Sequence, residues 1–137
     1  MTSAKETLHT LKEMRMTPTD PAQDIRSRRV VDSDGQSLGK IDGLLVDDQE
    51  EKVRFLRVEF GGFLGIGEKK SLIPVEAITK IGDKVVTVNQ TRERVVGAPL
   101  YDPSLVDDRY YDSLYGYYGW APYWGTGYVY PPYPYYP

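Results

Sequence analysis

"VRFLRVEFGGFLGIGEKKSLIPVEAI", residues 53–78, predicts two β-strands joined by a glycine-rich turn. Alternate residues from Leu56 to Phe60 are apolar and the residues between them are charged, which is the pattern of a strand that buries one face. Val53 and Phe55 are apolar in the opposite phase. Because one extra residue in a strand reverses the phase of its side chains, this offset predicts a β-bulge or bend near residue 55.

The glycine-rich turn has the composition of a phosphate-binding loop but not its sequence. Gly62 and Gly67 match the glycines of G-x-x-x-x-G-K-[ST], yet Glu68 stands where lysine is needed, and its carboxylate would repel a phosphate. Such a loop also opens a helix, whereas residues 71–74 are expected to continue as a strand. The turn therefore predicts no nucleotide site. Its apolar tip, expected to fold back over the domain or to contact a partner, consists of Phe63, Leu64 and Ile66.

Outward from this hairpin, residues 24–103 carry further short β signals. Asp34-Gly35 separates two apolar runs, and a charged turn at residues 47–52 separates two more. Residues 91–97 fit one helical turn. Six short strands without long helices between them predict a mainly β fold, a small antiparallel six-stranded β-barrel. A barrel of this size fills its interior with its own side chains, so we expect no enclosed substrate cavity.

Residues 1–23 are predicted to form a short helix followed by a linker. A capping-box pattern at Ser3, with Leu8 and Leu11 as a small apolar stripe, favours a helix over residues 1–16. Two prolines then interrupt the chain. The segment lacks the apolar core of a secretory signal, and we expect a cytoplasmic location.

Residues 104–137 form a tail of different composition. After Asp112 the sequence has no charged residue, and eleven of the 12 tyrosines lie at or after Tyr110. Glycine and proline at this density disfavour a helix, so we expect a disordered low-complexity tail whose removal from residue 113 leaves the barrel folded. Tyrosine and tryptophan are nevertheless common in interface hot spots. The aromatic candidates for a second contact surface are Tyr115, Tyr117, Tyr118, Trp120, Tyr123 and Trp124.

The composition offers little for catalysis or cofactor binding. Cysteine is absent and His9 is the single histidine, so thiolate, imidazole-metal and Ser-His-Asp chemistry lack their residues. The acidic cluster from Asp47 to Glu51 is expected to be a solvated turn, and Glu76 to face solvent. A net charge of −3 and a tail without basic residues disfavour nucleic-acid binding. No apolar run has membrane-spanning length. We predict no enzyme, cofactor or metal site.

Several motifs, in order along the chain, resemble the PRC-barrel domain family. They are "DGQSLGKI" at 34–41, "LLVD" at 44–47, "VRFLRVEFGG" at 53–62 and "LIPVEAI" at 72–78, while "TRERVVGAPLYDP" at 91–103 is similar to the stand-alone members. The resemblance implies a PRC-barrel fold and a docking or assembly role without enzymatic activity. The family includes the cytoplasmic part of the photosynthetic reaction centre H subunit and half of a ribosome-maturation factor.

Three functional hypotheses follow. The favoured one is a non-catalytic protein-interaction or assembly module, with a protein partner, homodimerisation left open, and the aromatic tail as a second contact surface. The second is a reaction-centre H-subunit-like protein associated with a photosynthetic or electron-transfer complex, in which Asp42, Asp47 and Asp48 would relay protons. The third is a ribosome- or RNA-maturation factor. The transmembrane helix of the second class and the N-terminal domain of the third do not precede the barrel motifs in this sequence. We therefore expect neither specialised role.

Overall fold

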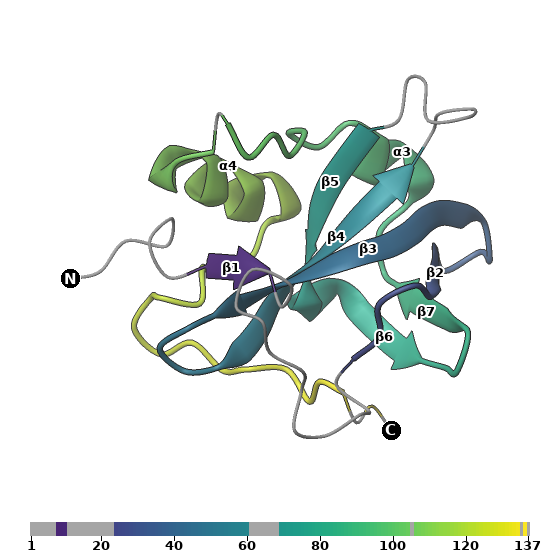
Figure 1. Cartoon of the computed structure of the whole chain (residues 1–137), viewed down its shortest axis with the longest axis horizontal. Helices are drawn as coiled ribbons and strands as arrows, with labels where there is room; N and C mark the ends of the chain where they lie inside the picture. Colours follow the sequence, from purple (N-terminus) through teal and green to yellow (C-terminus); the bar gives the residue numbers. More distant parts are fainter. Residues whose placement is uncertain (1–7, 11–23, 61–68, 105, 135, 137) are drawn as a thin grey trace.

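The computed structural model describes residues 8–10, 24–60, 69–104, 106–134 and 136. These residues form a mainly β fold, in which one seven-stranded sheet is accompanied by a few short helices (Figure 1). The strands are β1 (Leu8–Thr10), β2 (Arg29–Val31), β3 (Ser37–Asp47), β4 (Lys52–Phe60), β5 (Lys69–Pro74), β6 (Ile78–Ile81) and β7 (Val85–Val88). The helices are the 3₁₀ turn η2 (Val75–Ala77), α3 (Arg92–Val96) and α4 (Asp108–Tyr118). No helix in these ranges is long and apolar enough to cross a membrane.

The strands follow the order β5-β4-β3-β2-β7-β6, with β1 paired to β3 beside that path. All pairs are antiparallel except β2 with β7, which is parallel. The outer strands β5 and β6 are not paired with each other, so the sheet is open. The prediction of a mainly β fold is confirmed, whereas a closed, wholly antiparallel six-stranded barrel is not what forms. Pro74 ends β5, and η2 redirects the chain so that β6 pairs with β7 instead.

The predicted bulge near residue 55 is present in β4. Leu45 of β3 lies opposite Phe55, but the next residue, Val46, lies opposite Val53. Arg54 is therefore the extra residue of β4. Because the phase reverses there, Val53, Arg54 and Phe55 are all buried. The sequence pattern alone located this irregularity.

The N-terminal residues that the structure describes do not form the predicted helix. Leu8–Thr10 is strand β1, with Leu8 opposite Asp47 and Thr10 opposite Leu45 on β3. A short isolated helix is marginal in water. The second half of β3 has a free edge beyond β2, and pairing with it satisfies backbone groups that a helix would otherwise satisfy locally. The other residues of the predicted helix and linker lie outside the described part of the chain.

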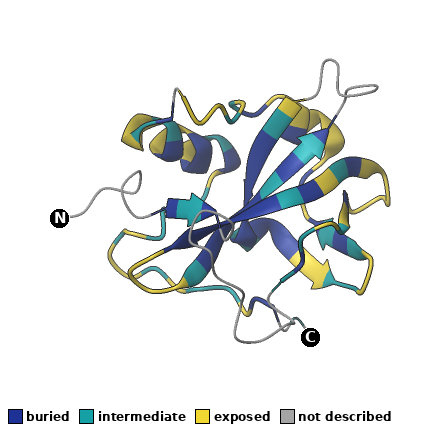
Figure 2. Cartoon of the chain, in the orientation of Figure 1, coloured by how far each residue is buried: buried dark blue, intermediate teal, exposed yellow. Residues whose placement is uncertain are grey.

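The prediction of a disordered tail is wrong for α4. Asp107 caps its first turn by accepting a hydrogen bond from the backbone N–H of Tyr110, and Gly119 ends it with a positive φ of 82°. Its buried residues recur at helical spacing and are Tyr111, Leu114, Tyr115 and Tyr118. The buried side of α4 faces the sheet and the opposite side is exposed (Figure 2). The first proline after α4 is Pro122, so helix-breaking residues start only beyond it.

Two groups of buried apolar residues hold these layers together. One lies between β2, β3, β4, η2, β6 and β7 and includes Ile41, Leu56 and Val86. The other lies between the sheet and α4 and includes Phe55 and Leu114. Tyr111 and Tyr115 place their ring centroids 5.7 and 5.3 Å from that of Phe55. The helix is thus part of the packed fold, and removing the chain from residue 113 onward would strip buried side chains from the second core, contrary to the sequence-based expectation.

Candidate functional site

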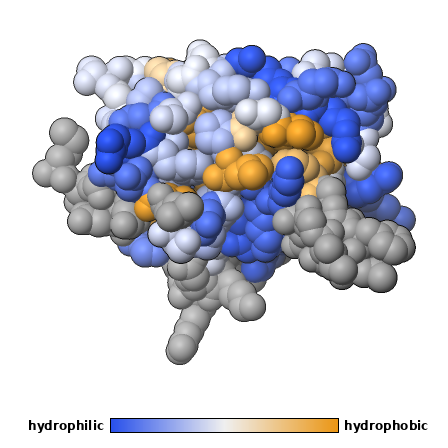
Figure 3. Space-filling view, turned by 90° about the horizontal axis from the view of Figure 1, so that it is seen from above, coloured by the Kyte–Doolittle hydropathy of each residue, from blue (hydrophilic) through white to orange (hydrophobic). Residues whose placement is uncertain are grey.

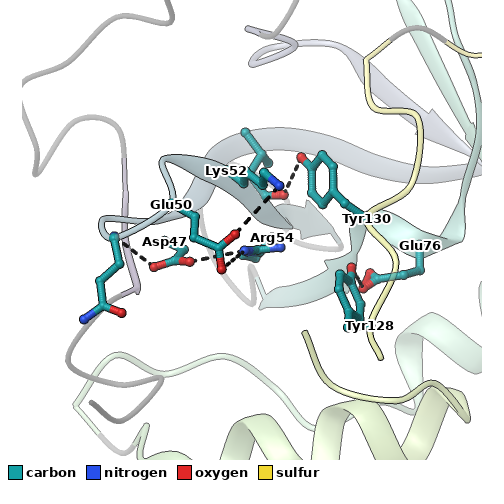
Figure 4. Close-up of polar contacts among 9 residues, drawn as sticks. Asp47, Glu50, Lys52, Arg54, Glu76, Tyr128 and Tyr130 are labelled. Carbon is teal, nitrogen blue, oxygen red and sulfur yellow. Dashed lines mark hydrogen bonds and ion pairs between the residues drawn. The ribbon is translucent and has the colours of Figure 1, made fainter. Parts of the chain in front are cut away.

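A buried arginine organises the contact between the sheet and the C-terminal segment (Figure 4). Arg54, placed inward by the β4 bulge, has a side chain that is only 2% exposed. Its Nη2 atom lies 3.2 Å from Oδ2 of Asp47 and 3.4 Å from Oε1 of Glu50. A buried cation requires such partners because desolvation of an unpaired charge is strongly unfavourable. Asp47 is itself buried, which corrects the prediction that this carboxylate belongs to a solvated turn.

Aromatic rings from the tail cover the other side of this guanidinium. The Arg54 Cζ atom lies 4.2 Å from the ring centroid of Tyr123, 5.4 Å from that of Tyr130 and 5.9 Å from that of Tyr128. A desolvated guanidinium is attracted to the negative face of an aromatic ring. Lys52 adds a second cation, with its Nζ atom 4.9 Å from the centroid of Tyr130. The uncharged tail therefore meets positive charge supplied by β4.

The tail crosses the lower side of the sheet in Figure 1 as an irregular segment, and we call its residues 120–136 the aromatic strap. Three tyrosine hydroxyls of the strap donate hydrogen bonds to the sheet and η2. Tyr128 donates to Oε1 of Glu76 at 2.7 Å. Tyr130 donates to the carbonyl of Val53 at 3.0 Å, and Tyr136 to that of Val75 at 3.4 Å. Tyr133 is buried among the first core group.

The sequence predicted that Glu76 faces solvent. The structure instead places its carboxylate beneath the strap, so this prediction is wrong. Burial raises the pKa of this carboxyl, although the hydrogen bond from Tyr128 and the charge of Arg54 oppose the rise. Three buried polar atoms in this neighbourhood have no hydrogen-bond partner among the described residues: Nε of Arg54, Oε2 of Glu76 and the hydroxyl of Tyr115. The strap therefore covers a polar site without satisfying all of it.

The structure disperses the aromatic residues that the sequence proposed as a contact surface. Tyr115 and Tyr118 are buried in the second core. Tyr117 is partly buried, and its hydroxyl donates a hydrogen bond to the backbone carbonyl of Arg94 in α3. Trp120 stacks on Tyr118, with ring centroids 5.9 Å apart, and Tyr123 covers Arg54.

Trp124 is the most exposed of the six aromatic candidates, at 39%. Its ring meets that of Tyr115 edge-on, with centroids 5.5 Å apart. The predicted apolar tip of Phe63, Leu64 and Ile66 lies outside the described residues.

The carboxylates that were considered as proton relays lie beside basic side chains. Oδ1 of Asp42 accepts from Nε of Arg57 at 2.8 Å, and its Oδ2 lies 2.8 Å from Nζ of Lys70. Burial acts to raise the pKa of Asp42, but these hydrogen bonds outweigh it and the pKa is lowered. Asp48 lies 3.3 Å from the imidazole of His9. With its pKa lowered, Asp42 stays ionised at neutral pH and is poorly suited to passing protons.

Exposed apolar side chains gather elsewhere, around α3 and the outer edge of β5. Val96 ends α3 and is 42% exposed, and Leu100, which bridges Ser71 of β5, is 48% exposed. Figure 3 shows hydrophobic atoms on the upper face of the molecule, which carries α3. Sequence reasoning missed this surface because both residues lie in a short polar and proline-containing stretch. Among the described residues no group of histidine and acidic side chains is arranged to hold a metal ion.

One protein-family model matches the part of the chain that contains strands β2 to β7. The PRC-barrel domain model aligns with residues 19–95, which is more than half of the chain. The chain belongs to the PRC-barrel family. PRC-barrel domains are generally non-catalytic and often mediate protein interactions. A search of curated proteins finds no match. Arg54 and Glu76 lie within the matched PRC-barrel segment, whereas Leu100, α4 and the aromatic strap lie beyond it.

Proposed function

We propose that the protein is a non-catalytic protein-interaction or assembly module built on its PRC-barrel. The observation that carries the proposal is the exposed apolar pair of Val96 and Leu100 beside the outer edge of β5. Exposed apolar side chains are a common site of protein docking, because burying them is favourable. The family supports this role, since its domains often mediate protein interactions.

The contact surface that we propose includes residues from three places. Val96 and Leu100 supply its described centre. The apolar residues between β4 and β5 are proposed from the sequence alone as a second contact, and Trp124 of the strap is the most exposed of the tail candidates. The loop residues in question are Phe63, Leu64 and Ile66. The buried tail aromatics, by contrast, stabilise the fold of the chain itself.

A site-specific photo-crosslinking residue at Leu100 tests the proposal in living cells. We expect it to capture a protein partner, and the double variant Val96→Ser/Leu100→Ser to lower the yield of the same product when the probe is placed at the neighbouring Tyr101. The control probe is Asp83, an exposed residue in the turn between β6 and β7. Capture of the same proteins from both positions, or of none from Leu100, would contradict the proposal.

The identity of the captured protein also separates the more specific roles. A photosynthetic or electron-transfer protein would indicate a reaction-centre H-subunit-like role. A ribosomal protein or maturation factor would indicate a role in ribosome assembly. A second copy of this chain would indicate that the β5 edge is a dimer interface.

A further inference from the structure

The aromatic strap is attached to the PRC-barrel as a bound peptide would be. Between residues that the structure describes, no backbone N–H group of the strap donates to the sheet: Trp120 donates to the carbonyl of Tyr115 at the end of α4, Gly125 to that of Pro122 and Tyr128 to that of Gly125. A strand of the sheet is instead fixed by a ladder of backbone bonds. What joins the strap to the barrel is a set of side chains, the hydroxyls and rings described above.

The two sides of this contact are complementary in chemistry. The strap contributes no charge, and its hydroxyls act as donors. The barrel contributes cations for the rings, at Arg54 and Lys52, and acceptors for the hydroxyls, at Glu76 and at the carbonyls of Val53 and Val75. These cations and acceptors can bind a tyrosine-rich segment. The same contacts form whether the segment belongs to the same molecule or to another one.

Two observations indicate that the strap can leave. The unpartnered Nε of Arg54 and Oε2 of Glu76 are buried beneath it, and both regain water as hydrogen-bond partner when the strap lifts. The chain between α4 and the strap is also short and permissive. Gly119, exposed and with φ of 82°, ends the helix, and a side chain at this position would meet no neighbouring atom.

α4 stays packed on the sheet when the strap dissociates, because its buried residues contact Phe55 and Leu72 as well as the strap. Lifting exposes the apolar surroundings of Tyr133 in the first core, so the vacated face has a strong tendency to be covered again. The segment that fits it by charge, hydroxyl spacing and ring position is another aromatic strap.

We propose that the barrel face around Arg54 and Glu76 is a recognition site for the aromatic strap, and that two copies of the chain exchange their straps across it. The partner is therefore a second copy of this chain, and short connections of this kind favour such exchange. This inference rests on the proposed function in one respect, namely that the tail takes part in intermolecular contacts. A chain whose Leu100 surface captures no partner can still exchange straps, so the two proposals fail separately.

The test uses the full-length chain with a protease recognition sequence inserted between Gly119 and Trp120, cleaved after folding. Native mass spectrometry and gel filtration should show residues 120–137 retained at high protein concentration and released on dilution. An isotopically heavy synthetic peptide of residues 120–137 should replace the light one. The uncleaved chain without the insertion should show a concentration-dependent dimer.

Variants identify the site. Tyr128→Phe with Tyr130→Phe keeps both rings and removes two hydroxyl donors, and we expect about tenfold weaker retention of the strap or more. Arg54→Leu should weaken it further. Arg57→Leu is the control, because Arg57 lies on the same strand and pairs with Asp42 away from the strap. It should leave retention unchanged.

Several results would overturn the inference. One is loss of the fold on cleavage, which would make the strap a structural part of the barrel. Others are failure of the heavy peptide to exchange and equal retention in the Tyr→Phe and Arg57 variants. An intact chain that remains monomeric at every concentration would overturn exchange between copies.

Discussion

Helix α4 and the aromatic strap are made from the same residue type but are held in different ways. In α4 the rings of Tyr111 and Tyr115 pack on Phe55, and no described residue forms a hydrogen bond with the buried hydroxyl of Tyr115. In the strap, by contrast, Tyr128 and Tyr130 are only partly buried and both hydroxyls are bonded. Apolar burial therefore fixes these rings of α4, whereas in the strap hydroxyl hydrogen bonds are added to the burial of rings such as Tyr133.

The role of each tyrosine depends on the surface that it contacts. The face under α4 is apolar, with Leu45, Phe55 and Leu72 among its residues. The face under the strap carries Arg54 and Glu76. We infer that α4 belongs to the stable core and that the strap is a second, more weakly held layer.

The largest expected effect is on the α4 side. Leu114→Ala removes a fully buried side chain from the second core and should lower the free energy of unfolding by about 3 kcal/mol. Urea denaturation measures the change. The matched control is Ser113→Ala, the exposed neighbour on the same helix, which should shift stability by less than about 0.5 kcal/mol. Equal effects of the two changes would mean that α4 is not docked on the sheet.

Removing single tyrosine hydroxyls should change the free energy of unfolding by less than Leu114→Ala does. Tyr130→Phe removes the donor to the carbonyl of Val53 and should lower the free energy of unfolding by about 1 kcal/mol. Tyr115→Phe removes a hydroxyl that is buried without a partner and should leave stability unchanged or raise it. The same denaturation measurement compares them. A loss of stability in Tyr115→Phe as large as that in Tyr130→Phe would contradict the distinction between the two layers.

The smallest expected effect is a pH dependence that originates at Glu76. Burial raises the pKa of this carboxyl above its ordinary value of 4.5, so the folded chain binds the proton more tightly than the unfolded chain. Stability should therefore fall as pH rises from about 4.5 through the raised pKa, and then level off.

Glu76→Gln should remove this slope, since the amide does not titrate. Stability measured across the acidic to neutral range checks the prediction, with Glu93→Gln, an exposed acid on α3, as the control. If the slope persisted in Glu76→Gln and disappeared in Glu93→Gln, the pH dependence would originate at Glu93, and the prediction would be wrong.

Much of the sheet could be predicted from the sequence because its signals are local. The phase reversal at Phe55 located the bulge, and the run of alternate apolar residues to Phe60 located β4. The fit of one helical turn to residues 91–97 is confirmed by α3. Each of these features is decided by neighbours within a few positions, where periodicity and turn chemistry act directly.

The signal for α4 was also local, but it was concealed by the composition of the segment that follows. Asp107 is a helix cap, and Tyr111, Leu114, Tyr115 and Tyr118 have helical spacing. Treating residues 104–137 as one low-complexity tail gave the glycines and prolines beyond Tyr118 too much weight. A window restricted to the residues before Pro122 predicts the helix.

By itself, the sequence determined the strand phases, the bulge, the turns and the family. Only the tertiary structure decided that β1 is a strand, because its partner β3 supplies the hydrogen bonds from a distant part of the chain. It also decided that Arg54, Asp47 and Glu76 are covered. A charge can leave water only where other groups replace its hydration, and here those groups include tyrosines of the strap, such as Tyr128, which is 52 residues from Glu76 along the chain.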